Sequence, residues 1–92
     1  MTHSIIHEPD QHRYLVHLQD GMYAQVIYRQ QDQVLLLTST HVPDSLQGKG
    51  YGGIMMETVL PQIEADGFKI TPVCSYVVHY LDKHPEWAHL VA

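Results

Sequence analysis

The chain has a single cysteine and few basic residues among its 92 residues. One cysteine excludes an internal disulfide and is typical of a reducing compartment, so we expect a cytoplasmic protein. Five Lys and Arg residues stand against ten Asp and Glu residues, and the formal net charge is −5 at pH 7. Nucleic acids and anionic membranes are bound by clustered positive charge, so we expect neither as a partner.

Long apolar runs are also absent. No stretch approaches the roughly twenty apolar residues that a membrane-spanning helix needs. The first residues have neither the basic segment nor the apolar core of a secretory signal. The hydrophobic fraction of 45% is ordinary for a globular protein and argues against disorder. We therefore expect residues 1–92 to form a single domain.

Glycine is concentrated in one place. Four of the six glycines lie within six residues, between positions 48 and 53. An apolar run at 33–40 precedes them and predicts a strand, and a helical pattern of apolar residues at 51–65 follows. A glycine-rich loop between a strand and a helix is typical of a phosphate site, because the backbone can approach an anion and the first helical N–H groups have no partner in the helix.

Two common phosphate-binding signatures do not fit this loop. Lys49 is followed by Gly50 and not by Ser or Thr, which excludes a P-loop. The spacing of Gly48, Gly50 and Gly53 matches the dinucleotide pattern GxGxxG, but the predicted strand ends too early and no acidic residue stands about twenty positions later. The remaining alternative is a flexible turn, for which one or two glycines would suffice.

The segment from Gln47 to Gly52 has the form [Q/R]-x-x-G-x-[G/A], which resembles the acetyl-CoA pyrophosphate loop of the GNAT N-acetyltransferase superfamily. Further motifs, spread from about Arg13 to Leu90, resemble a small single-domain GNAT-like branch of that superfamily. These motifs are Thr40-x-Val42-Pro43-x-x-Leu46-x-Gly48-Lys49-Gly50, Pro72-x-Cys74-Ser75-Tyr76-Val77 and Tyr80-Leu81-x-x-His84-Pro85-Glu86-Trp87.

The resemblance implies an N-acetyltransferase that moves an acetyl group from acetyl-CoA to an unidentified amine acceptor, either directly or by way of an acetyl group on Cys74; the sequence does not choose between the two routes. It also leaves open a non-catalytic module that binds acyl-CoA and acts as an interaction partner or sensor. No metal is expected, because the eight histidines show no ligand spacing. The residues implied to bind the donor are Val42, Gln47, Gly48, Lys49, Gly50, Tyr51, Gly52 and Gly53.

Three residues are candidates for catalysis. Cys74 lies where a strand should end and a helix begin, a position that lowers a thiol pKa; the alternative is an inert buried cysteine. His41 ends the predicted central strand, where relatives tend to have Glu, and an imidazole can take the proton of the amine. Tyr76 and Tyr80 are one helical turn apart; the resemblance implies that such a tyrosine protonates the CoA thiolate, and we select Tyr80.

The expected fold is a mixed α+β, GNAT-like arrangement. Antiparallel strands at 4–7, 13–18 and 22–29 lead into a central strand at 33–40, which we expect to be covered on both faces. A parallel strand at 68–73 splays away from it, and helices cover 51–65 and 75–84. Pro61 should bend or break the first helix near residues 57–60. The tight hairpin at Asp20-Gly21 leaves no room for helices between the first long strands, so the acceptor side should be open or closed by a second subunit in a homodimer.

Overall fold

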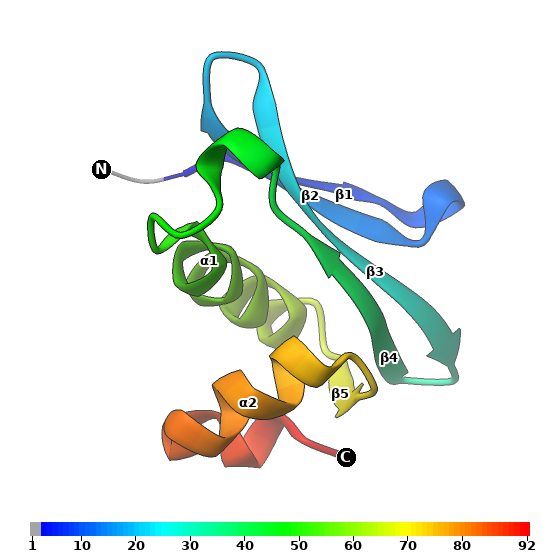
Figure 1. Cartoon of the computed structure of the whole chain (residues 1–92). Helices are drawn as coiled ribbons and strands as arrows, with labels where there is room; N and C mark the ends of the chain where they lie inside the picture. The colour runs from blue at the N-terminus through cyan, green and yellow to red at the C-terminus, as the bar shows by residue number, and fades with distance from the viewer. Residues whose placement is uncertain (1–2) are drawn as a thin grey trace.

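The structure, a computed structural model, describes residues 3–92 and contains one five-stranded sheet with two α-helices (Figure 1). The strands follow one another in chain order across the sheet. The elements are β1 (Ile5–Glu8), β2 (Arg13–Gln19), β3 (Met22–Gln31), β4 (Val34–His41), α1 (Tyr51–Ala65), β5 (Lys69–Pro72) and α2 (Ser75–Lys83). The first four strands are antiparallel neighbours and β5 is parallel to β4, which confirms the predicted mixed fold.

Tight turns connect the antiparallel strands. Asp20 and Gly21 have φ values of 38° and 76°, as a two-residue hairpin of this hand requires. Asp32 (φ 55°) serves the β3–β4 turn. Since β2 runs directly into β3, no helix lies between them, as predicted.

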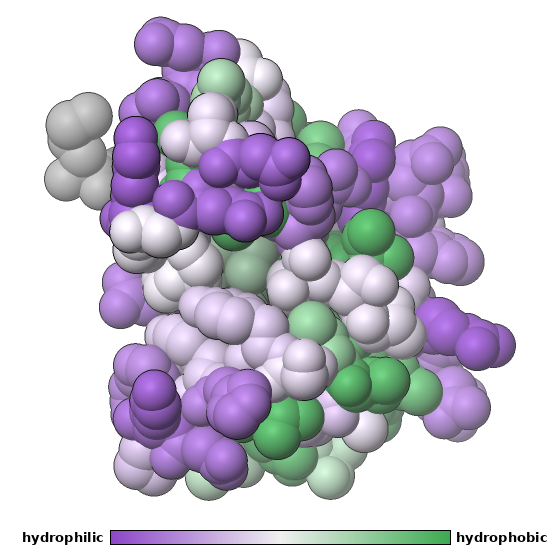
Figure 2. Space-filling view, in the orientation of Figure 1, coloured by the Kyte–Doolittle hydropathy of each residue, from purple (hydrophilic) through white to green (hydrophobic). Residues whose placement is uncertain are grey.

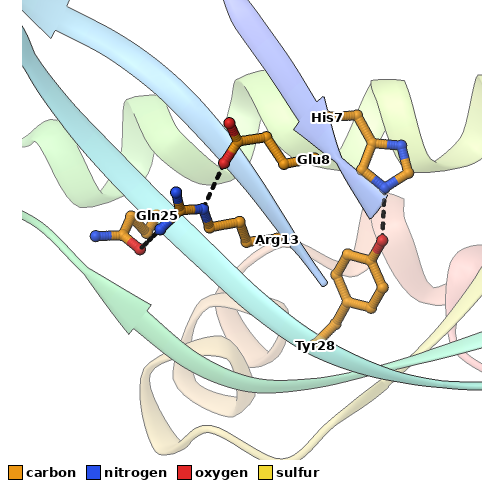
Figure 3. A network of polar contacts seen from close by, with 5 residues as sticks. All are labelled: His7, Glu8, Arg13, Gln25 and Tyr28. Atoms are coloured by element: carbon orange, nitrogen blue, oxygen red, sulfur yellow. Dashed lines mark hydrogen bonds and ion pairs between the residues drawn. The ribbon is translucent and has the colours of Figure 1, made fainter. Parts of the chain in front are cut away.

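Polar side chains join the first three strands (Figure 3). Arg13 donates from Nε to Glu8 Oε1 at 2.6 Å and from its guanidinium to Gln25 Oε1 at 3.2 Å. His7 Nε2 and the Tyr28 hydroxyl share a hydrogen bond on the other face of the sheet. The Arg13–Glu8 pair is about one third exposed, so it contributes little to stability.

Both helices lie on the same face of the sheet (Figure 1). That face carries the fully buried strand residues, whereas Leu15, Ile27, Val34 and Leu36 on the opposite face, the open face, stay partly exposed. The prediction that β4 is covered on both faces is therefore wrong. The β4–α1–β5 crossover places α1 on one side, and α2 then packs on that side too. The buried strand residues are Tyr14, Val16, Leu18, Ala24, Val26, Tyr28, Leu35, Leu37 and Ile70.

Helix α1 continues through Pro61 as one element, so of the bend or break predicted there, the break does not occur. Proline removes one helical hydrogen bond and costs about 3 kcal/mol in a helix interior. Val59, Leu60 and Ile63 are fully buried on either side of it, and their packing against the sheet holds the helix together. Pro61 itself faces solvent.

A β-bulge alters β4 before its end. The register with β3 shifts between Ile27 and Tyr28, which leaves Thr38 without a partner, and the Thr38 hydroxyl donates to the Ile27 carbonyl at 3.3 Å. The extra residue changes which side chains share a face. Thr40 pairs with Val26 and lies on the helix-covered face, while His41 pairs with Gln25 and lies on the open face.

The parallel pair separates beyond Leu37. β5 ends at Pro72 opposite Leu37, and the N–H groups of Val73 and Cys74 both donate to the Leu37 carbonyl, at 3.1 and 2.9 Å. β4 continues to His41 with β3 as its only neighbour. The predicted divergence of the two strands is confirmed, and it leaves the β5 side of the last part of β4 without a strand partner. Within residues 3–92, no helix is long and apolar enough to cross a membrane.

Candidate functional site

A cleft of about 390 Å³ opens where β4 and β5 separate, and it is called the α1 cleft below. Thr40 and Val42 line it from the end of β4, Tyr76 lines it from α2, and the glycine-rich loop with the start of α1 forms the remaining wall. In Figure 2 it lies near the middle of the visible face, between the hydrophilic loop and α2. Of the eight residues predicted to bind a donor, all except Lys49 line the cleft.

The loop has a backbone that depends on glycine. Gly48 and Gly50 have φ values of 78° and 82°, in the left-handed region that other residues rarely adopt. Gly50 is the N-cap of α1, and no side chain caps that end of the helix. The first N–H groups of α1, whose residues line the cleft, therefore have no helical or side-chain acceptor, and the helix dipole makes this end partly positive.

Gln47 stabilises the glycine-rich loop through hydrogen bonds of its side chain. Its amide donates to the Val42 carbonyl at 3.0 Å and to Asp44 Oδ1 at 3.3 Å. Leu46 is 2% exposed and anchors the same loop to the core. The polar and apolar contacts together hold the glycines against the end of β4.

Gly52 and Tyr76 are in close contact across the cleft. A Cβ atom at Gly52 would lie 2.5 Å from the Tyr76 hydroxyl, so only glycine allows this approach. The tyrosine hydroxyl consequently sits at the first turn of α1. Burial raises the pKa of Tyr76, so its hydroxyl keeps its proton at neutral pH.

Cys74 is the N-cap of α2 and lies behind Thr40, with its Sγ 3.5 Å from the Thr40 hydroxyl. Burial alone would raise the pKa of Cys74. Hydrogen bonds from the Thr40 hydroxyl and from the backbone at Val77, Tyr76 and Thr40 outweigh that effect, and the pKa lies below its ordinary value. The thiol is half-buried and adjoins the α1 cleft through Thr40.

The other two predicted catalytic residues lie elsewhere. His41 is exposed on the open face because of the β-bulge, and it does not line the α1 cleft. Tyr80 is 6% exposed and stacks on His84 with ring centroids 3.9 Å apart. Burial, followed by the charges of Glu57 and Glu86, raises its pKa to about 12. The catalytic roles of His41 and Tyr80 stay predictions.

Sequence reasoning gave no role to several residues that line the cleft, namely Thr40, Leu46 and Met55. Leu46 had a visible signal, since it is the one apolar residue between Pro43 and the glycines. Thr40 appeared only as a member of the first family motif, and simple alternation along the strand places His41 and not Thr40 on the face of Leu35 and Leu37. In residues 3–92 there is no group of three His, Cys, Asp or Glu side chains that could hold a metal ion.

The model of the GCN5-related N-acetyltransferase family matches residues 13–90. The chain belongs to this family. The solution structure of a GCN5-like protein from Staphylococcus aureus has the same fold, with a TM-score of 0.70 and 21% sequence identity over 97% of this chain and 87% of that one. No curated protein is detectably similar in sequence.

Family membership confirms the relationship predicted from the loop and the later motifs. The matched region begins with β2 and ends after α2, so it contains the β4–α1–β5–α2 unit that builds the α1 cleft. The small GCN5-related fold here thus places its glycine-rich loop, its strand divergence and its single cysteine side by side.

Proposed function

We propose that the α1 cleft binds acetyl-CoA and that the protein transfers the acetyl group to an amine. The observation that carries this proposal is the junction of two features in one cleft: an uncapped helix N-terminus behind a glycine-rich loop, and a strand end with an unpaired edge. The first suits a pyrophosphate and the second suits an amide-bearing arm such as pantetheine. Proteins of the GCN5-related family typically use acetyl-CoA, which supports this donor.

The N-terminus of α1 and the unpaired edge of β4 would bind different parts of acetyl-CoA. The pyrophosphate would lie on the N–H groups at the start of α1, next to Gly50 and Gly52, and the pantetheine arm would follow β4 at Thr40 and Val42. Lys49 does not line the cleft, so backbone groups and the helix dipole supply most of the favourable field for the anion. This arrangement directs the thioester toward Thr40 and Cys74.

We assign the first chemical step to Cys74. The described side chains that line the cleft include two tyrosines and no carboxylate or imidazole, so none is suited to deprotonate an amine at neutral pH. The Cys74 thiolate attacks the thioester carbonyl, the bond from that carbon to the CoA sulfur breaks, and the CoA thiolate leaves and accepts a proton from the Tyr76 hydroxyl. An amine then attacks the acetyl-cysteine, the bond from the acetyl carbon to Sγ breaks, and the Cys74 thiolate is released. The amine loses one proton, which balances the proton that the Tyr76 phenolate takes back.

The acceptor side belongs to the open face of the sheet. β2 and β3 are joined by a two-residue hairpin, so no helices enclose that side within residues 3–92. His41 lies there and could take the proton of an amine that approaches from the open face, in direct transfer or in the second step. A second subunit in a homodimer is a further way to enclose the acceptor.

The test is incubation with acetyl-CoA followed by intact-mass measurement. One added acetyl group that hydroxylamine removes, and that Cys74→Ser does not acquire as a thioester, is expected. Acetyl-CoA should also raise the melting temperature, whereas NAD should not. Gly50→Val, which forces a β-branched residue to a φ of 82°, should abolish the shift. No stabilisation by acetyl-CoA at millimolar concentration would refute the donor site.

A binding module without turnover is the second candidate. The exposed acceptor side favours it, because an acetyltransferase normally has to hold its amine in place. Release of free CoA in the presence of candidate amines separates the two functions: steady release indicates an enzyme, and stoichiometric or no release indicates a module that responds to acyl-CoA.

A further inference from the structure

A second hollow, of about 240 Å³, adjoins the α1 cleft and is called the α2 hollow below. Gly53 and Tyr76 line both cavities, so they share a wall. The α2 hollow lies between α1, which contributes Glu57, and the side of α2 that carries Tyr80 and Lys83. Apart from Tyr76 in the shared wall, the proposed transfer chemistry uses none of its residues.

The side chains of the α2 hollow combine an aromatic wall with charge. Tyr80 and His84 stack nearly parallel, with an angle of 13° between the rings, and His84 Nδ1 is held 2.8 Å from the Tyr80 carbonyl oxygen. His79 and Lys83 are both exposed and stand four residues apart, which places them on one side of α2. Lys83 is the only Lys or Arg side chain among the described residues that line either cavity.

We propose that the α2 hollow binds the 3′-phosphorylated adenosine end of the same CoA molecule, an inference that rests on the proposed function. The shared wall means that a ligand whose pyrophosphate lies at the start of α1 can continue past Gly53 and Tyr76 without leaving the surface. Lys83, with His79 beside it, is the cation for the 3′-phosphate, and the aromatic wall contacts the base. The Glu57 carboxylate, on the opposite wall, is an acceptor that suits the exocyclic amine of adenine.

The proposed phosphate site predicts different affinities for CoA and 3′-dephospho-CoA. CoA and 3′-dephospho-CoA differ only in the phosphate assigned to Lys83. A charge-assisted hydrogen bond to that phosphate corresponds to about tenfold in the dissociation constant. The protein should therefore bind CoA about tenfold more tightly than dephospho-CoA at low ionic strength, and added salt should narrow the difference.

The experiment is calorimetric titration of the full chain with both ligands. In Lys83→Gln, the affinity for CoA should fall to that for dephospho-CoA, whose own affinity stays unchanged. Arg29→Gln is the matched control, because it removes one positive charge from an exposed residue of β3 that lines neither cavity. Its preference for CoA should equal that of the unmodified protein.

Three outcomes overturn the inference. Equal affinities for the two ligands in the unmodified protein exclude a 3′-phosphate site. An equal loss of affinity for both ligands in Lys83→Gln would show that the lysine stabilises the fold and does not bind the phosphate. A cation in the last turn of α2 interacts favourably with the helix dipole. Failure of both ligands to bind refutes the proposed donor site as well, whereas tight binding without discrimination refutes the α2 hollow alone.

Discussion

At the scale of single residues, the Cys74 thiol is subject to opposing effects. Burial favours the neutral thiol, and hydrogen-bond donors around it favour the thiolate. The donors prevail, so the pKa is lowered. The Thr40 hydroxyl is the one side-chain donor among them. Thr40 also lines the α1 cleft, so it contacts both the cleft and the thiol.

Thr40→Val should raise the pKa of Cys74, since it removes a donor to the thiolate and keeps the shape of the side chain. A hydrogen bond to a charged group corresponds to about one pKa unit, and the alkylation rate well below the midpoint should fall about tenfold. Iodoacetamide labelling against pH measures this without ambiguity, because the chain has one cysteine. Thr40→Ser retains the hydroxyl and should keep the low midpoint. An unchanged midpoint in the valine variant would show that backbone donors alone stabilise the thiolate.

Gly52 and Gly53, neighbours in the first turn of α1, should respond in opposite ways to alanine. The new Cβ of Gly52→Ala would lie 2.5 Å from the Tyr76 hydroxyl, so the tyrosine must move, at a cost of about 1 kcal/mol, and acetyl-CoA should bind more weakly. Gly53→Ala meets nothing within 4 Å and should stabilise the helix by about 0.5–1 kcal/mol. Urea unfolding and thermal shift with acetyl-CoA measure both effects. Tyr76→Phe removes the nearest atom, so Gly52→Ala should cost less in that background.

At the scale of secondary-structure elements, most of the fold could be predicted from local signals. The turn at Asp20-Gly21, the glycine-rich loop and the apolar periods fixed the order and type of every major strand and helix. The bulge at Thr38 could not be predicted, because nothing in the residues of β4 distinguishes a bulged strand from a regular one. Its effect on the site is large, because it places Thr40 on the cleft side and His41, which was selected for its place at the end of the strand, on the open face.

Local sequence signals also failed to predict the continuity of helix α1. Local propensity predicts a break before Pro61, but burial of Val59, Leu60 and Ile63 overrides it. Pro61→Ala restores the N–H donor for the carbonyl of Glu57 and should raise the free energy of unfolding by about 1–3 kcal/mol. Urea unfolding tests this at an unchanged m value. A variant less stable than the natural chain would mean that the proline's restriction of the unfolded state outweighs its missing hydrogen bond.

At the scale of the whole molecule, the distribution of functional groups follows the two faces of the sheet. The donor features lie on the helix-covered face, where the packing of α1 and α2 can fix a long ligand. The open face carries His41 and the partly exposed Leu15, Ile27 and Leu36. The sequence predicted the donor loop because its chemistry is local. It could not predict the contact of Tyr76 with Gly52, since those residues meet only after the β4–α1–β5–α2 chain has folded.

The buried tyrosines should limit stability in alkali. Burial raises the pKa of Tyr80 from 10.0 to about 12 and also raises that of Tyr14, whose hydroxyl donates to Asp66. A group with a raised folded-state pKa contributes its stability fully below the unfolded-state pKa and loses it as the pH rises through the folded-state value. The free energy of unfolding should therefore fall from about pH 10 toward pH 12 as these phenols ionise. Urea unfolding at a series of pH values, with tyrosinate absorbance recorded in parallel, measures the loss.

Two variants serve as test and control. Tyr80→Phe has no phenol proton to lose, so the loss of stability in alkali should be smaller. Tyr23 is a partly exposed tyrosine on the open face, so Tyr23→Phe should leave the loss unchanged. A stability that stays constant to pH 12 would show that the phenols ionise without leaving their packed positions.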